Sequence, residues 1–148
     1  MAVSLAEFAD RITEVMPVVA REFIRQRPDE LCRGLVTPPQ FLVLNYLETR
    51  GELKMTDLAK LIGVTTAAMT GVVDRIVRRR YAERVFEPTD RRVIKMRPTA
   101  KGLALVKKIK EQKKEMVIKL FGRLPQQDRE EYLRIITKIR DILARERS

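Results

Sequence analysis

Residues 55–76, MTDLAKLIGVTTAAMTGVVDRI, carry the strongest fold signal in this chain. Gly63 has the backbone freedom that a tight turn needs, and Thr65 or Thr66 is suited to cap the helix that follows. The small Ala59 before the turn lets two helices approach closely. The inner face of the second helix is predicted to hold four apolar residues at helical spacing: Met69, Val72, Val73 and Ile76. The pattern predicts a helix-turn-helix, with an ordinary helical hairpin of a small α protein as the alternative.

The segment after this helix has the pattern of two short strands. Residues 81–86 are rich in β-favouring side chains, and residues 92–98 alternate with a period of two. A hairpin here forms a wing whose tip carries Asp90, Arg91 and Arg92. Arginine suits a narrow, electronegative minor groove, while the aspartate can hydrogen-bond the turn backbone or orient a neighbouring guanidinium. The alternative is a solvated surface hairpin, and the composition of the tip argues against it.

Helices are also expected before this stretch. Residues 4–7 have the Ser-x-x-Glu form of a capping box that opens a helix, and Pro17 should kink that helix or divide it in two. Residues 37–40, TPPQ, place Thr at the N-cap and Pro at the first helical position, and this helix should end near Gly51. Thr56 is expected to cap the short helix before the turn. Capping is the favoured role, and phosphate binding at a helix N-terminus the alternative, for Thr37, Gln40 and Thr56.

Two helices are expected after the wing. Thr99 caps a long helix that should run to about Phe121, and a second helix should start at Pro125. Apolar stripes on these helices and on the N-terminal helix can bury one another between two copies of the chain, or within one chain as a bundle. Six lysines between residues 101 and 114 form either a solvated face or contacts to flanking phosphates. The expected fold class is mainly α with a small β-hairpin wing.

Charge is concentrated in the middle of the chain. The 148 residues include 31 Lys and Arg against 20 Asp and Glu, a formal net charge of +11. Residues 53–98 have 11 basic and five acidic side chains, and residues 99–123 have eight and two, whereas residues 1–52 carry a slight acidic excess. A polyanionic partner is therefore expected along the helix-turn-helix and the wing, and the ends are expected to do something else.

The composition argues against several other functions. The chain has no His and a single Cys, so the commonest general base and transition-metal ligand are missing, and no intramolecular disulfide can form. Because no Gly-rich phosphate loop is visible either, we expect no enzyme activity, metal or cofactor. No apolar run approaches the roughly 18 residues of a membrane span, and the N-terminus is unlike a targeting signal. We therefore expect a cytoplasmic protein that has no membrane partner.

Several short motifs occur at a characteristic spacing. They are TPPQF at 37–41, Leu58-Ala59 with Gly63-Val64 at the turn, VDRI at 73–76, DRR at 90–92 and TAKG at 99–102. Together they resemble the MarR-type (multiple antibiotic resistance regulator) transcription factors, most closely over about residues 35–105. The resemblance implies a homodimeric winged-helix repressor. Such a repressor binds a pseudo-palindromic operator in double-stranded DNA and is often released by a small aromatic or phenolic ligand.

One position departs from the pattern of that family. The family usually has Gly and then an aliphatic residue at the end of the recognition helix, where this chain has Arg80 and Tyr81. Either Arg80 adopts the left-handed backbone conformation at a modest cost, or the helix ends differently. The angle between the recognition helix and the wing depends on which of these holds.

The exposed sides of the recognition helix and wing supply the candidate DNA contacts. The start of a recognition helix normally reaches base edges, but here it offers Thr and Ala, so direct readout should be modest. Arg75 is the best candidate for a guanine contact, with an ion pair to a nearby carboxylate as an equal alternative. Asp90 is expected to orient the wing. The side chains expected at phosphates or in the general positive field are Arg78, Arg79, Lys95 and Arg97. The candidate DNA-binding residues are Thr65, Thr66, Ala67, Thr70, Arg75, Arg78, Arg91, Arg92 and Lys95.

The resemblance alone implies an effector crevice between the dimerisation helices and the DNA-binding lobe. A small aromatic or anionic ligand is expected there, although ordinary core or surface roles are the favoured interpretation of each lining residue. The candidate lining residues are Phe8, Ile12, Met16, Phe41 and Asn45. Cys32 lies beside Arg33, which favours oxidation, but an inert thiol is the favoured interpretation. The missing His argues against a zinc sensor.

Two hypotheses about function are open. The first is a sequence-specific transcriptional regulator, whose affinity for its operator should exceed that for random duplex by at least ~10³. The second is a non-specific architectural or nucleoid-type DNA-binding protein, which the sparse set of base-reading residues keeps open. In either case we expect one MarR-like domain over residues 1–148. It would comprise a winged helix-turn-helix lobe at 37–98 and a helical dimerisation region at 1–30 and 99–148.

Overall fold

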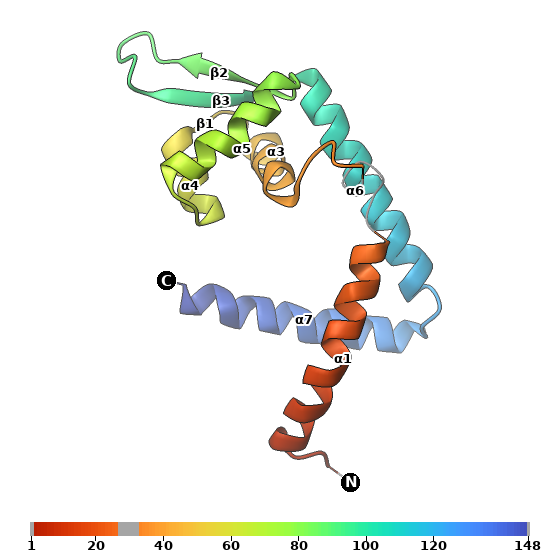
Figure 1. Ribbon diagram of the computed structural model, residues 1–148. Coiled ribbons are helices and arrows are strands. Elements are labelled where there is room, and N and C mark those ends of the chain that lie inside the picture. Colours follow the sequence, from red (N-terminus) through yellow and green to blue (C-terminus); the bar gives the residue numbers. More distant parts are fainter. Residues whose placement is uncertain (1, 27–32, 148) are drawn as a thin grey trace. The chain divides into compact units, whose positions relative to one another are not determined.

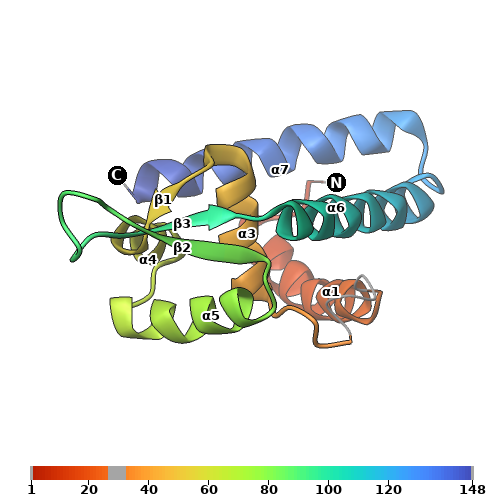
Figure 2. The ribbon, with the colours of Figure 1, turned by 90° about the horizontal axis from the view of Figure 1, so that it is seen from above.

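The computed structural model describes residues 2–26 and 33–147 and shows a mainly helical chain with a small antiparallel sheet (Figures 1 and 2). Its contacts group into two compact units, Met1–Gln112 and Lys113–Ser148. The predicted fold class is confirmed. In chain order the elements are α1 (Leu5–Arg25), α3 (Pro38–Arg50), β1 (Leu53–Lys54), α4 (Met55–Ile62), α5 (Thr66–Arg78), β2 (Ala82–Phe86), β3 (Ile94–Pro98), α6 (Ala100–Phe121) and α7 (Gln126–Glu146).

The core of the first unit lies where α3, α4, α5, β3 and the start of α6 meet. Full burial of one Leu, Ile or Met side chain stabilises a fold by about 1.5–3 kcal/mol. The largest fully buried side chains come from all five elements: Leu44, Leu47, Leu58, Met69, Ile76, Met96 and Ile109. These residues come from the helix before the helix-turn-helix, from the helix-turn-helix itself and from the elements after it. The core therefore packs α4 and α5 against the start of α6.

Local capping begins α3 and α1 where the sequence predicts. The Thr37 hydroxyl oxygen accepts from the Gln40 N–H at 3.4 Å, and the Gln40 side-chain oxygen accepts from the Thr37 N–H at 2.9 Å. This capping box confirms the capping role of both residues. Ser4 caps α1 by accepting from the Glu7 N–H at 3.2 Å. Because α1 runs unbroken from Leu5 to Arg25 with Pro17 inside it, the alternative of two separate helices is wrong.

The turn between α4 and α5 has the predicted geometry. Gly63 ends α4 in the left-handed conformation, with φ +79° and ψ +35°, and its N–H donates to the Ala59 carbonyl at 2.9 Å. Thr65 is the N-cap of α5 and accepts from the Ala68 N–H at 3.1 Å. The expected cap at Thr56 is wrong. Because β1 passes directly into α4 at Met55, Thr56 already lies inside the first turn.

The wing belongs to a three-stranded antiparallel sheet in the order β1-β3-β2. β2 and β3 pair from Ala82 opposite Pro98 to Phe86 opposite Ile94. β1 pairs with β3 through Leu53 opposite Met96, and no pattern in the sequence predicts this strand. A two-residue strand is too short to show an alternating pattern, so only its partner identifies it.

α5 ends in a tight, fully hydrogen-bonded turn. The Arg80 N–H donates to the Val77 carbonyl at 2.9 Å, and the Tyr81 N–H donates to the Ile76 carbonyl at 3.0 Å. These two bonds form a Schellman motif whose left-handed residue is Arg80, with φ +63°. The left-handed alternative for Arg80 is therefore confirmed, at a cost of about 1–2 kcal/mol for a residue with a Cβ atom.

The start of α6 packs against this turn at very short range. Thr99 accepts from the Gly102 N–H at 3.1 Å, and Gly102 is buried against the backbone of Tyr81. A Cβ atom at Gly102 would lie 1.9 Å from the Tyr81 carbonyl oxygen, which is far inside van der Waals contact. Only glycine fits between α6 and the end of the recognition helix.

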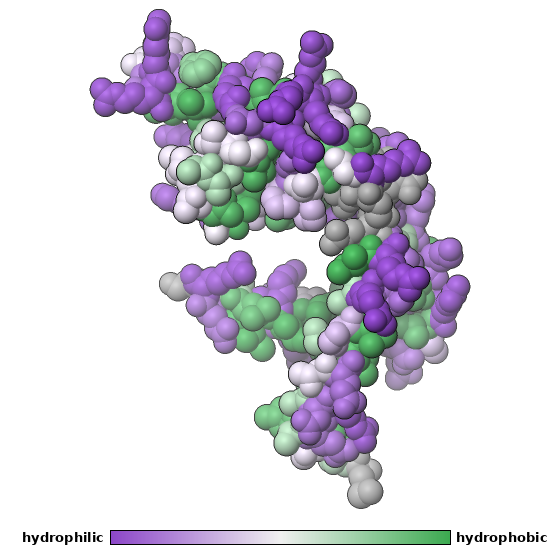
Figure 3. All heavy atoms as spheres, viewed as in Figure 1, coloured by the Kyte–Doolittle hydropathy of each residue, from purple (hydrophilic) through white to green (hydrophobic). Residues whose placement is uncertain are grey.

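The helices at the two ends of the chain leave apolar side chains in solvent. α7 has no buried residue, although the rings of Phe121 and Tyr132 pack with their centroids 5.2 Å apart within the second unit. α1 has no buried residue either. Figure 3 shows hydrophobic side chains at the surface of α7. The large exposed apolar residues of α7 are Tyr132, Leu133, Ile135, Ile136, Ile139, Ile142 and Leu143. In the described residues, no helix is long and apolar enough to cross a membrane.

The close contact at Gly102 predicts a large effect of one methyl group. Gly102→Ala should lower the free energy of unfolding by more than about 2 kcal/mol, because the Tyr81 carbonyl is backbone and cannot move aside. Gly71→Ala is the matched control: Gly71 lies inside α5, and its Cβ position has nothing within 4 Å. The control should gain about 0.5–1 kcal/mol of stability. Urea unfolding measures both, and similar values would show that Gly102 is not a packing constraint.

Candidate nucleic-acid interface

Small side chains line the exposed start of α5. Thr65, Thr66, Ala67 and Thr70 are all exposed, as the pattern predicts for the outer face of this helix. The Thr65 hydroxyl oxygen accepts from the Ala68 N–H, and the Thr70 hydroxyl donates to the Thr66 carbonyl at 3.0 Å. Because its proton is engaged, the Thr70 hydroxyl is left to accept from a base. The bases with an amino donor in the major groove are adenine and cytosine.

Arg75 and Arg78 continue the exposed face of α5 towards its end. The acid beside them, Asp74, forms an ion pair with Arg84 of β2, which links the recognition helix to the wing. Within the described ranges, neither Arg75 nor Arg78 has an ion pair or a side-chain hydrogen bond. The ion-pair alternative for Arg75 is therefore not seen, and its guanidinium is available for a base or a phosphate.

The wing tip is an ordered turn that carries two exposed arginines. The Asp90 carboxylate accepts from the Arg92 N–H at 3.0 Å, and the Asp90 carbonyl accepts from the Val93 N–H at 3.1 Å. Of its two predicted contacts, Asp90 makes the one to the turn backbone. Arg91 and Arg92 are exposed on the loop that extends beyond the helices of the first unit in both ribbon views (Figures 1 and 2).

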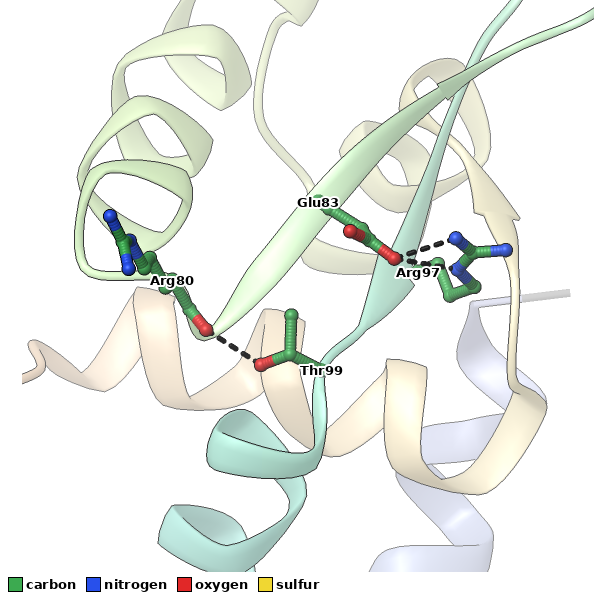
Figure 4. Close-up of polar contacts among 4 residues, drawn as sticks. All are labelled: Arg80, Glu83, Arg97 and Thr99. Atoms are coloured by element: carbon green, nitrogen blue, oxygen red, sulfur yellow. Dashed lines mark hydrogen bonds and ion pairs between the residues drawn. The ribbon is translucent and has the colours of Figure 1, made fainter.

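Two basic side chains of β3 are paired with carboxylates rather than free. Lys95 Nζ lies 3.0 Å from Glu87 and 3.9 Å from Glu52, and the hydrogen bond and charge of Glu87 raise the pKa of Lys95. Arg97 donates twice to Glu83, at 2.6 and 2.9 Å, which raises the pKa of Arg97 (Figure 4). The sequence predicts both cations at phosphates or in the general positive field. In the structure they link the strands of the wing, and a phosphate would have to compete with these carboxylates.

Three further cations of the first unit have partners that are distant in sequence. Arg79 Nη1 donates to the Leu35 carbonyl at 2.9 Å, and Lys101 Nζ donates to the Arg79 carbonyl at 3.0 Å. Lys110 forms a 2.6 Å ion pair with Glu48 of α3. These partners lie 44, 22 and 62 positions apart, so no local pattern in the sequence points to them. Lys101 and Lys110 are thus structural contacts and not part of a purely solvated lysine face.

The candidate effector residues lie in different environments. Phe41 is 8% exposed and belongs to the core, whereas Phe8 and Met16 on α1 are 53% and 60% exposed. Ile12 is half-buried. Asn45 is also half-buried, and its side-chain oxygen is shielded from solvent without a hydrogen-bond partner in the part of the chain that the structure describes. Cys32, a candidate redox residue, lies outside the described residues.

The geometry defines a class of protein. A recognition helix with exposed threonines and arginines is followed by an antiparallel wing with an arginine tip, and the Asp74–Arg84 pair links the two. A helix of this kind fits the major groove of DNA, and a basic hairpin tip fits an adjacent minor groove. The fold and the site are those of a winged-helix DNA-binding protein.

Comparison with known proteins agrees with this class and identifies the family. The MarR family model matches residues 36–93. The HTH-type transcriptional repressor MdtR of Bacillus subtilis is 36% identical over 67 residues, which span 45% of this chain and 43% of that protein. A crystal structure of a MepR-like protein complexed with pseudoligands is 30% identical over 90% of this chain and 94% of the other, with a TM-score of 0.62. The fold also matches the YusO protein of Bacillus subtilis, with a TM-score of 0.80, 22% identity and coverage of 93% and 98%. The chain belongs to the MarR family and is a DNA-binding transcriptional regulator.

Arg75 is unpaired among the described residues and Arg97 is paired with Glu83, so replacing each by Ala should change DNA affinity by different amounts although the lost charge is the same. Arg75→Ala should weaken binding to the preferred duplex by about 10- to 100-fold, because an unpaired guanidinium is removed from the recognition helix. Arg97→Ala removes the same charge from a Glu83-bound side chain and should change affinity by less than about threefold. Fluorescence-anisotropy titrations at one fixed salt concentration measure both. Equal losses would mean that the Glu83 pairing does not keep Arg97 from DNA.

Proposed function

We propose that the protein is a homodimeric, sequence-specific repressor that binds a pseudo-palindromic operator and is released by a small molecule. The observation that carries sequence-specific binding is the arrangement of exposed polar side chains on α5 and at the wing tip. The exposed threonines at the start of α5 and the free guanidinium of Arg75 lie on the same helix, and the exposed Arg91 and Arg92 lie at the wing tip. Such groups can read bases in the major groove while the wing contacts the minor groove.

The proposed dimer is supported by the apolar surfaces of α1 and α7. Large apolar side chains that stay exposed along a helix mark an interaction site. Phe8 and Met16 of α1 and the apolar residues of α7 have no cover within one described chain. In this proposal residues 37–98 form the DNA-binding lobe, and residues 1–30 and 99–148 form the dimerisation region of one domain. A two-fold axis would present two recognition helices about 34 Å apart, one turn of DNA.

The repressor and effector parts of the proposal are supported by relatives. MdtR is a transcriptional repressor, and the MepR-like protein was crystallised with pseudoligands. In this chain the effector would be a small aromatic or anionic molecule that contacts Phe8, Ile12, Met16, Phe41 and Asn45. The unpartnered side-chain oxygen of Asn45 is the polar atom in this set that a ligand donor group would satisfy.

A second candidate function is a non-specific architectural DNA-binding protein. The observation that favours it is the scarcity of base-reading groups on α5, where the first turn offers only hydroxyls and a methyl group. A protein of this kind would bind through charge alone, and all duplexes of equal length would compete equally.

The wing provides a test through the salt dependence of binding. Arg91→Ala and Arg92→Ala should each weaken DNA binding and reduce the slope of log affinity against log salt by about one unit, because each removes a contact that displaces a counterion. Glu83-bound Arg97 again supplies the control, since Arg97→Ala should leave the slope unchanged. If both tip variants kept the wild-type affinity and slope, the wing would not contact DNA.

The proposed function as a whole is tested by selecting duplexes from a random pool. A specific repressor should recover a sequence with two inverted half-sites and bind it at least ~10³-fold more tightly than random duplex at physiological salt. Light scattering at micromolar protein should give the mass of two chains. Equal affinity for all duplexes would establish the architectural alternative, and the mass of one chain would remove the dimer.

A further inference from the structure

The C-terminal end of the recognition helix is held from two sides through one residue. The side chain of Arg79 donates to the Leu35 carbonyl at 2.9 Å, in the segment that leads into α3. The carbonyl of Arg79 accepts from Lys101 Nζ at 3.0 Å, in the first turn of α6. Arg79 thus joins the segment before α3, the end of α5 and the start of α6.

Thr99, directly before α6, and Lys101 in its first turn make further contacts with the same short stretch. The Thr99 hydroxyl donates to the Arg80 carbonyl at 2.6 Å, which Figure 4 shows, and the Thr99 N–H donates to the Tyr81 carbonyl at 3.1 Å. The Lys101 ammonium also lies 4.9 Å from the centroid of the Tyr81 ring, which is 7% exposed. Every carbonyl of residues 79–81 therefore accepts a hydrogen bond from Thr99 or Lys101.

These contacts supply what the end of a helix lacks. The last carbonyls of a helix have no partners inside it, and the partial negative charge there favours a cation. The Schellman motif satisfies Ile76 and Val77, and the Arg79 N–H donates to the Arg75 carbonyl at 3.2 Å. The bonds of that motif do not reach the Arg79 carbonyl, and the cation that donates to it comes from α6. One exposed lysine of α6 thus contributes to the direction of α5 relative to α6, beside the two hydrogen bonds of Thr99.

A small tilt of α5 at its C-terminal end causes a large displacement of its first turn, which faces the DNA in the proposed complex. α5 has 13 residues, so its first turn lies about 20 Å from Arg79. A tilt of about 10° at that end moves the base-reading turn by about 3.5 Å, which is close to the rise of one base pair. A change of this size in the angle between α5 and α6 is therefore enough to change the half-site spacing that the two recognition helices fit.

We propose that Lys101 is a positioning residue that sets the direction of the recognition helix relative to α6 and thereby the half-site spacing that the dimer accepts. The proposal rests on the proposed function, since spacing has meaning only for two recognition helices on one operator. It distinguishes Lys101 from a phosphate contact. A lost phosphate contact weakens binding to all duplexes alike, whereas a lost positioning contact removes the preference among spacings.

The test uses the full-length wild-type protein and three variants. Lys101→Met keeps the aliphatic stem but removes the donor and the charge, and Lys101→Arg keeps both. Lys107→Met is the matched control, because it removes the same charge from an exposed position six residues further along α6. Each protein is titrated against the operator selected by the wild type and against the same operator with one base pair inserted or deleted between the half-sites. Circular dichroism confirms that each protein is folded, and Lys101→Ala, which also removes the donor and the charge, replaces the Met variant if that variant aggregates.

The wild type, Lys107→Met and Lys101→Arg should bind the selected spacing on the order of 10-fold or more tightly than the altered spacings. Lys101→Met should bind all three within about threefold of one another. If Lys101→Met kept the wild-type preference, or lost affinity equally at every spacing with a shallower salt dependence, Lys101 would not be a positioning residue. If the wild type itself showed no preference for spacing, the proposed dimer on two half-sites would fail, and the inference with it.

Discussion

The DNA-facing surface depends on how the recognition helix ends. At residues 79–81 the chain leaves α5 through Arg80, which has φ +63°, and turns directly into β2. Gly102 lies against the Tyr81 backbone so closely that no side chain fits between them. Residues 79–81 thus form the end of α5, lead into the first strand of the wing and provide the backbone against which α6 packs. The strain of a left-handed arginine is small beside the hydrogen bonds and packing that hold it.

Seven cations of α5 and the wing fall into two groups that differ in their partners. Arg84, Lys95 and Arg97 are paired with carboxylates and connect the wing to α5 and to its own strands. Arg75, Arg78, Arg91 and Arg92 have no such partner among the described residues. A paired cation must give up its carboxylate before it contacts a phosphate, whereas an unpaired one gives up only water and mobile counterions. These four unpaired cations lie on α5 and at the wing tip, which is the surface that we propose for DNA.

Most of the elements could be predicted because their signals are local. The capping box at Thr37 and Gln40, the turn at Gly63 and the cap at Thr65 each depend on residues within four positions. The predictions that fail depend on a distant partner. β1 exists because Leu53 pairs with Met96, and α4 therefore begins at Met55, before the expected cap at Thr56. A short strand has no periodicity of its own, so the pairing alone defines it.

The sequence by itself determined the helix-turn-helix, the hairpin that follows it and the concentration of charge along them. Apolar spacing, capping residues and turn residues act over a few positions, so these signals can be recognised in the sequence. The tertiary structure alone decided which cations are free and how the recognition helix is held. Asp74 pairs with Arg84, which is ten positions away. Lys101 donates to the Arg79 carbonyl over 22 positions, and Arg79 donates to the Leu35 carbonyl over a separation of 44. Contacts between residues so far apart depend on which surfaces the packed core brings together, so only the folded structure identifies them.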